Sequence, residues 1–268
     1  MTAKTHARRP VRHTAILCLL LGMSIVPVLP VQAQHPDSLP SIVLPPTDGS
    51  TLQPATMQYQ ILMNMMGQEM KMEGTRTISA AYYKDRPVWR LVDTGNSDWG
   101  PYADSIEVDR QTLLPVRRRS VGSSNTTLLY TEDAVTGEIA MGPNTMPVNV
   151  SLEAPIFGSE SSLELAIAGM TLAEGDTMLL RSFYPYTQQV RTMKLSVTGT
   201  ETTEVPAGAF ETLVVELAPL DGDGSERWVL RMMPQTPHYL VQGHYHLPKS
   251  IGGGLIVVTL LSQDAEAQ

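Results

Sequence analysis

From Met57 onward, apolar and polar residues alternate in short runs, a pattern typical of β-strands that bury one face. Further strand-like runs are predicted at 69–79, 88–94, 105–109, 116–121, 126–131, 137–141, 146–152, 177–183, 188–200, 212–217, 227–232, 239–247 and 255–261. Gly, Pro, Asn and Asp separate many of these runs, and these are turn residues. The pattern therefore predicts hairpins in an antiparallel sheet rather than βαβ units.

One segment departs from this period of two. Ser161 followed three residues later by Glu164 resembles a capping box, and Leu163 and Ile167 share one face of a helix. Gly169 is expected to end this helix in a left-handed conformation. The helix is too short to be stable alone, so it must pack against the sheet. The predicted fold class is mainly β with minor α: a curved antiparallel sheet or incomplete β-barrel wrapped around a short helix.

The N-terminal residues predict export. Arg8, Arg9 and Arg12 precede an apolar run from 15 to 29, and Ala33 ends a Val-Gln-Ala sequence that suits signal-peptide cleavage. No later segment is long and apolar enough to span a bilayer, so the mature protein is expected to be soluble, without a transmembrane segment.

These features predict four segments: a signal peptide at 1–33, a proline-rich N-terminal arm at 34–56, an antiparallel half-barrel domain at 57–262 and a polar C-terminal tail at 263–268. The arm contains five prolines and no repeating apolar period, so it is expected to act as a tether or a loose arm.

Charge and cysteine usage exclude several functions. The formal charge of the whole chain is −8, and removal of the four basic residues of the leader brings it to −12. Nucleic-acid binding requires clustered Lys and Arg, so no nucleic-acid partner is expected. The one cysteine, Cys18, lies in the leader, and the mature chain can therefore form no disulfide.

No cofactor and no metal site are expected. His244 and His246 lie two residues apart on one predicted strand, a spacing at which two imidazoles can share a metal. No thiolate or strong carboxylate pattern accompanies them, so a polar outward strand face is the preferred interpretation.

Several motifs in the second half of the chain occur in a known order. Residues 170–185 read MTLAEGDTMLLRSFYP, residues 205–212 read VPAGAFET, and residues 227–248 read RWVLRMMPQTPHYLVQGHYHLP. Together with VDRQTLLPV at 108–116, this order resembles the bacterial exported family called domain of unknown function 3108. The resemblance covers roughly 58–261.

The resemblance implies a fold and a location. Members of that family have no assigned activity, and their fold is thought to be similar to lipoprotein-localisation factors (LolA/LolB-like), a curved incomplete barrel around one or more helices. It implies a lipid or lipoprotein acyl chain as the candidate ligand, and the periplasm or cell envelope of a Gram-negative-type bacterium as the location. Fold analogy is a weak warrant for function, and the protein partner is not identified.

The chain is also rich in methionine, whose flexible thioether side chain adapts to irregular apolar partners. If the Met-rich face lines the hollow of a half-open barrel, it would suit an acyl chain; the alternative is an ordinary packed core, as in a purely structural or docking module. The candidate ligand-binding residues are Tyr59, Ile61, Met63, Met65, Trp89, Leu91, Leu213, Val215, Trp228 and Leu230.

A second motif suggests catalysis. Asp93-Thr94-Gly95 resembles the active-site loop of aspartic proteases, whose chemistry needs two aspartates that share a proton. The chain has one such triplet, so a dimeric aspartic peptidase using Asp93 is the alternative function. A strand that ends in an Asp-Thr-Gly turn is the preferred interpretation, and the protein is predicted not to be an enzyme.

Overall fold

The computed structural model describes residues 44–65, 67–97, 100–122 and 124–265. The predicted signal peptide, the first part of the proline-rich arm and the last three residues of the predicted tail lie outside this part of the chain. The chain divides into two units, 1–39 and 40–268, and everything below concerns the second.

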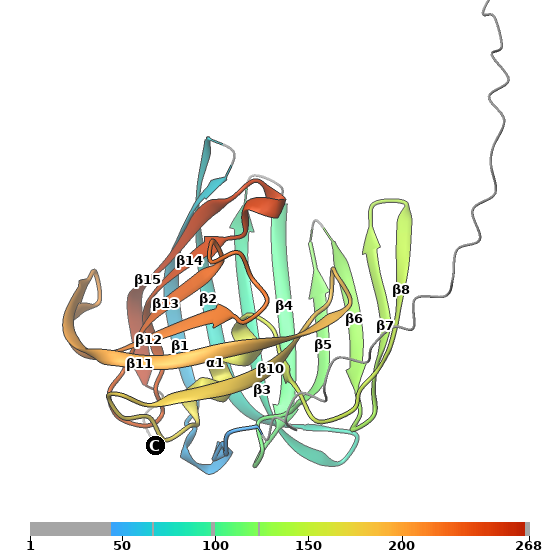
Figure 1. Cartoon of the computed structure of the whole chain (residues 1–268), viewed down its shortest axis with the longest axis horizontal. Helices are drawn as coiled ribbons and strands as arrows, with labels where there is room; N and C mark the ends of the chain where they lie inside the picture. The colour runs from blue at the N-terminus through green and yellow to red at the C-terminus, as the bar shows by residue number, and fades with distance from the viewer. Residues whose placement is uncertain (1–43, 66, 98–99, 123, 266–268) are drawn as a thin grey trace, which may run out of the picture. The chain divides into compact units, whose positions relative to one another are not determined.

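The described chain forms one sheet of fifteen strands, in the order β8-β7-β6-β5-β4-β3-β2-β1-β15-β14-β13-β12-β11-β10-β9 (Figure 1). Neighbouring strands in this order pair antiparallel, except that β9 pairs with β10 in parallel, and the consecutive strands β8 and β9 lie at opposite ends of the sheet. The strands are β1 (Ala55–Met65), β2 (Gln68–Tyr83), β3 (Arg86–Ser97), β4 (Gly100–Asp109), β5 (Pro115–Val121), β6 (Asn125–Tyr130), β7 (Ala134–Met141), β8 (Asn144–Ser151), β9 (Phe157–Gly158), β10 (Thr177–Tyr184), β11 (Gln189–Val205), β12 (Gly208–Pro219), β13 (Arg227–Met232), β14 (Leu240–Leu247) and β15 (Gly254–Ala265).

The sheet bends around one short helix, α1 (Ser161–Ala168), which Figure 1 shows between the β1–β4 wall and the β10–β11 hairpin. Register shifts interrupt the ladders of β1 with β15, β4 with β5, β11 with β12, and β13 with β14. Such bulges increase the local twist and bend a strand, and they help the sheet to curve. The predicted fold class, an antiparallel open sheet with a short helix, is confirmed.

Two apolar clusters stabilise the sheet. The larger surrounds α1, where every residue from Ser162 to Ala168 is buried. The smaller forms where β6, β7 and β8 approach β10, with Phe183 of β10 packed edge-on against Tyr130 of β6. The two ends of the sheet therefore meet through side chains and not through a backbone ladder.

Two hydrogen bonds from the β10–β11 turn also join these ends. The Gln188 Nε2 amide donates to the Pro147 carbonyl of β8 at 3.0 Å. The Tyr186 hydroxyl lies 2.9 Å from the Ser124 hydroxyl, which precedes β6. Among the described strands, the sheet does not close into a barrel.

The predicted local signals of the helix are wrong in detail. Glu160, not Ser161, is the N-cap residue, and it makes no side-chain capping hydrogen bond. The Ser161 and Glu164 side chains bind residues of the sheet instead, as described below. Gly169 has φ −98° and is not left-handed, although its N–H does donate to carbonyls of the last helical turn.

The predicted Asp-Thr-Gly turn is also wrong, because Asp93, Thr94 and Gly95 lie within β3 and pair with both neighbouring strands. The two-residue strand β9 was not predicted, since a run this short has no readable period. None of the helices in the described part of the chain has the length and apolar character needed to cross a membrane.

The described part of the N-terminal arm is packed against the sheet and is not loose. A short 3₁₀ turn, η1 (Gly49–Thr51), lies over β3, and the Trp89 indole N–H donates to the Gly49 carbonyl at 2.8 Å. Leu52 is 4% exposed within the larger core. A second 3₁₀ turn, η2 (Lys249–Ile251), precedes β15, which extends to Ala265 and includes the first residues of the predicted polar tail.

We therefore expect Leu52→Ala to destabilise the protein by about 2–4 kcal/mol, the usual cost of truncating a buried leucine. Gln53→Ala is the matched control, since Gln53 contacts Tyr239 only through its backbone. Urea denaturation measures the free energy of unfolding of both variants. Equal stability of Leu52→Ala and the unmodified protein would show that residues 44–54 are dispensable for the fold.

Candidate functional site

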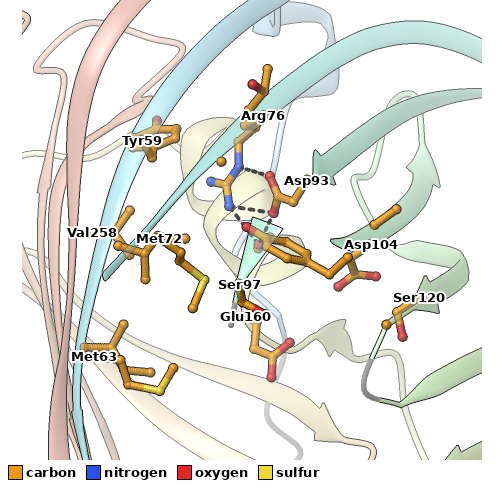
Figure 2. Close-up of a pocket in the computed structure, with 18 of the residues that line it drawn as sticks. Tyr59, Met63, Met72, Arg76, Asp93, Ser97, Asp104, Ser120, Glu160 and Val258 are labelled. Atoms are coloured by element: carbon orange, nitrogen blue, oxygen red, sulfur yellow. Dashed lines mark hydrogen bonds and ion pairs between the residues drawn. The ribbon is translucent and has the colours of Figure 1, made fainter. Parts of the chain in front are cut away.

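A cavity of about 500 Å³ lies on the inner face of the sheet (Figure 2). Its walls come from β1 to β5, from β13 to β15, and from the N-terminal end of α1. A volume of this size is within the range of pockets that hold small organic ligands.

One side of the cavity is apolar. Ile61 of β1 lies opposite Met72 of β2 and Val258 of β15, and Met63 lies opposite Ile256. These positions are cross-strand neighbours on one sheet face, so their side chains form a continuous apolar wall. All five are partly exposed, unlike the residues of the core beneath them.

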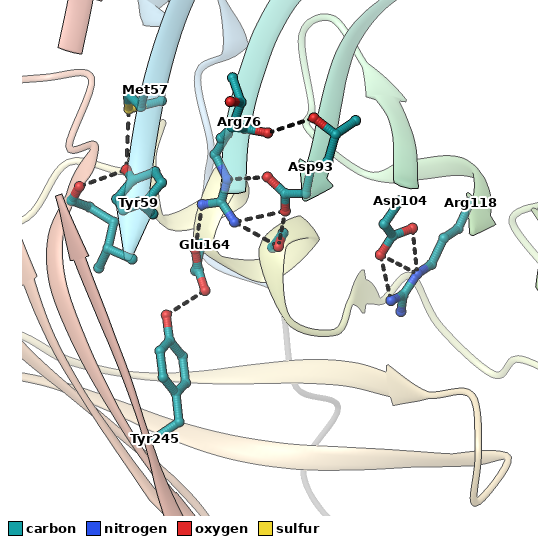
Figure 3. A network of polar contacts seen from close by, with 12 residues as sticks. Met57, Tyr59, Arg76, Asp93, Asp104, Arg118, Glu164 and Tyr245 are labelled. Carbon is teal, nitrogen blue, oxygen red and sulfur yellow. Dashed lines mark hydrogen bonds and ion pairs between the residues drawn. The ribbon is translucent and has the colours of Figure 1, made fainter. Parts of the chain in front are cut away.

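The other side of the cavity is polar and contains the buried guanidinium of Arg76 (Figure 3). Its Nε and Nη2 bind both carboxylate oxygens of Asp93 at 2.8 and 2.9 Å. Its Nη1 donates to Glu164 of α1 at 2.7 Å, and Nη2 also donates to the Ser161 hydroxyl at 2.7 Å. Bidentate pairing of this kind fixes geometry as well as charge.

The residues bound by Arg76 make further hydrogen bonds, which extend the network. The Ser161 hydroxyl donates to Asp93 at 2.7 Å, and the Tyr245 hydroxyl of β14 donates to Glu164 at 2.6 Å. The guanidinium also lies over the ring of Tyr59, 5.5 Å from its centroid, a favourable cation–π arrangement. The network therefore links β1, β2, β3 and β14 to α1.

A second buried arginine, Arg118 of β5, lies beside the first network. It binds Asp104 of β4 through Nε and Nη2, with a shortest distance of 2.6 Å, and Nη2 also binds Glu160 at 2.6 Å. The Glu160 side chain is half exposed (52%), whereas that of Arg118 is only 11% exposed. Glu160 has φ 56°, a left-handed value that is unusual for a residue other than glycine.

Burial and charge set the protonation of these groups. Burial opposes the charge on Arg76, but Asp93 and Glu164 outweigh it and raise the pKa of Arg76 well above its ordinary value. Burial, aided by Glu164, raises the pKa of Tyr245, so its phenol remains a donor. Burial also raises the pKa of Asp104, against the opposing effect of Arg118.

Two glycines make room for Tyr102 on the cavity wall. Gly74 of β2 pairs with Gly95 of β3, which pairs with Tyr102 of β4. A Cβ atom at Gly74 would lie 2.7 Å from the Tyr102 hydroxyl, and one at Gly95 would lie 2.7 Å from the Tyr102 ring. The missing side chains thus allow the Tyr102 ring to lie across β3.

The structure places the predicted ligand-binding residues in three different settings. Tyr59, Ile61, Met63 and Trp228 line the cavity. Met65 is half-buried at the end of β1 and does not line it. The other predicted residues pack into the larger core: Trp89, Leu91, Leu213, Val215 and Leu230.

The polar side of the cavity was not predicted from the sequence. Arg76 shares the sheet face of Met72 on β2, and Arg118 lies in the interior of β5. A charged residue at an inward-facing position of a strand was the available signal, because a buried charge needs a partner.

Asp93 lies opposite Asp104 across the β3–β4 ladder. The two carboxylates do not form a protease-type pair that shares one proton, because each is bound by its own arginine. Within the described residues, no group of three or more metal-ligating side chains is placed to hold an ion.

The fold and the cavity define an open antiparallel β-sheet protein with one amphipathic pocket. The chain belongs to the family described as protein of unknown function DUF3108, whose model matches residues 56–242. This confirms the family resemblance found in the sequence. No match was found among curated proteins.

Three solved structures are similar to this chain at low identity. A Bacteroides fragilis protein described as exported, with a YmcC-like fold, is 10% identical, with 83% of this chain and 99% of that chain covered and a TM-score of 0.33. A DUF1329 family protein from Desulfovibrio piger is 11% identical, with 82% and 88% covered and a TM-score of 0.32. A Parabacteroides distasonis protein described as a lipoprotein is 8% identical, with 82% and 97% covered and a TM-score of 0.31.

The raised pKa of Asp104 predicts a pH-dependent stability. The unfolded chain ionises this group near 3.8, whereas the folded protein ionises it only at higher pH. Its contribution is therefore fully present below 3.8 and is lost as the pH rises through the folded-state pKa. Relative to Asp104→Asn, the unmodified protein should lose stability as the pH rises above 3.8 and through the folded-state pKa.

Urea denaturation at a series of pH values measures this difference. Asp85→Asn, which removes an exposed carboxylate, is the matched control. If the unmodified protein instead becomes more stable relative to Asp104→Asn as the pH rises, the assignment is contradicted.

Proposed function

We propose that the protein is an exported, non-enzymatic envelope protein that binds the acyl chain of a lipid or lipoprotein in the cavity. The observation that carries the proposal is a pocket of about 500 Å³ with a continuous apolar wall on one side and a polar wall on the other. Molecules with both an acyl chain and a polar head match this division.

The apolar wall has the chemistry that an acyl chain requires. Met63 and Met72 are unbranched and polarisable, so they adapt to a flexible chain. Ile61, Ile256 and Val258 supply the rest of the surface, and all are accessible from the pocket. Covering this wall would remove apolar area from water, which favours binding by roughly 25 cal/mol per Å².

The fold is consistent with a carrier. An open antiparallel sheet curved around a helix matches the architecture that the family resemblance implies, that of lipoprotein-localisation factors. Fold analogy alone is a weak warrant for function, so the proposal depends on the pocket. The basic and apolar leader at residues 1–33 supports export to the periplasm or cell envelope.

The contacts of Asp93 favour binding over peptide hydrolysis. Both of its oxygens accept hydrogen bonds from Arg76, and one also accepts from Ser161. Both carboxylate oxygens are thus engaged by donors, whereas aspartic-protease chemistry needs two aspartates that share a proton. Peptide cleavage at acid pH that Asp93→Asn abolishes, with the fold retained, would contradict the proposal.

Native mass spectrometry tests whether the cavity is occupied in the cell. Protein purified from its own envelope without detergent extraction should carry a lipid whose mass is lost on delipidation. A mass equal to that of the bare chain, before any delipidation, would count against carriage and favour a structural or docking role.

A cavity-filling variant tests whether the acyl chain binds at the apolar wall. We expect Val258→Trp to abolish binding of a fluorescent acyl probe, because the indole would occupy the apolar wall. Val257→Trp is the matched control, since the neighbouring side chain points to the opposite face of β15. Met63→Trp provides a second test at a different strand. Undiminished probe binding in folded Val258→Trp and Met63→Trp would place the ligand elsewhere.

A further inference from the structure

We propose that the ligand of this cavity carries an ammonium group at its polar end and that anionic heads are disfavoured. This inference rests on the proposed function and adds the charge of the ligand to it.

The polar side of the cavity has an excess of negative charge. Its carboxylates and guanidiniums number four and two: Asp93, Asp104, Glu160, Glu164, Arg76 and Arg118. Their formal charges sum to −2. A cavity with low-dielectric walls focuses such a field, so a cation is attracted and an anion is repelled.

The two arginines are already engaged. Arg76 gives four of its five N–H donors to Asp93, Glu164 and Ser161. Arg118 binds Asp104 bidentately and Glu160 as well. Their side chains are only 12% and 11% exposed. An anionic head would therefore have to compete with carboxylates that are already in place.

Glu160 is the group best placed to receive a cation. Only its Oε2 contacts Arg118, and its Oε1 accepts no hydrogen bond from any described residue. Its side chain is 52% exposed, and Figure 2 shows it on the cavity wall below Asp93 and Asp104. The Glu160 carboxylate thus has an acceptor free for an ammonium N–H.

Two further features favour a cation. Glu160 and Asp93 both raise the pKa of Asp104, after burial, so a cation in the cavity would lie beside carboxylates that repel one another. The cavity also presents the aromatic rings of Trp228, Tyr245 and Tyr102, and ring faces attract cations. Neither feature would help to bind an anion.

Calorimetric titration with single-chain amphiphiles tests the proposal. Dodecylammonium and dodecyl sulfate, used below their micelle concentrations, have the same chain and opposite charge. We expect dodecylammonium to bind at least about tenfold more tightly, as partly screened charges at close range require. Equal affinity, or tighter binding of the sulfate, would overturn the proposal.

A second pair of probes separates two sources of the ammonium group. Lysophosphatidylethanolamine and lysophosphatidylglycerol both carry a phosphate, but only the first carries an ammonium. Preference for the ethanolamine lipid supports a phospholipid head. If the protein prefers dodecylammonium to dodecyl sulfate but does not prefer the ethanolamine lipid to the glycerol lipid, the ligand is an amine that lacks a phosphate.

Glu160→Gln tests whether the Glu160 carboxylate binds the ammonium group. It keeps an acceptor for Arg118 and removes one negative charge, so the preference for dodecylammonium over dodecyl sulfate should fall about tenfold. Glu132→Gln, at an exposed site outside the cavity, is the matched control. An unchanged preference in Glu160→Gln would contradict the assignment. Failure of all amphiphiles, dodecyl maltoside included, would refute the proposed function itself.

Discussion

The buried guanidinium of Arg76 is the interaction on which the rest of the structure depends. It holds Asp93 of β3 and both Ser161 and Glu164 of α1, and Glu164 extends the contact to Tyr245 of β14. The helix has no side-chain cap of its own and is only eight residues long. Its position inside the curved sheet is therefore set by tertiary contacts, of which the most directional come from this one side chain.

Such a network contributes more to geometry than to stability. Burying an ion pair costs several kcal/mol of desolvation per ion, and the attraction within the pair returns about the same amount. The apolar clusters around α1 and Phe183 supply the net stabilisation. The polar network instead keeps one side of the cavity from filling with apolar side chains, so that a space remains beside the Met63 and Val258 wall.

The sequence predicted the strands well because their burial follows a period of two, as in β1, where alternate residues from Ala55 to Tyr59 are buried. It failed where long-range partners decide. Ser161 and Glu164 have the spacing of a capping box, yet both bind the sheet. Asp93 has the neighbours of a turn, yet its strand continues through Gly95 because both adjacent strands pair with it. Of the predicted ligand-binding residues, Ile61 and Met63 lie on the apolar wall of the cavity, whereas Trp89 and Leu91 lie in the core. The charged side was not predicted, since the period of two alone does not show which acid meets which arginine.

The open seam between the two ends of the sheet has a consequence for the range of molecules that the pocket can hold. Among the described residues, the contacts that cross it are made by side chains, such as Gln188 with the Pro147 carbonyl and Tyr186 with Ser124. Opening the seam breaks no strand ladder, but it separates Phe183 of β10 from Tyr130 of β6 and exposes the smaller apolar cluster to water. A molecule wider than the cavity must therefore make enough apolar contact to offset this lost packing, which restricts the girth of the occupants.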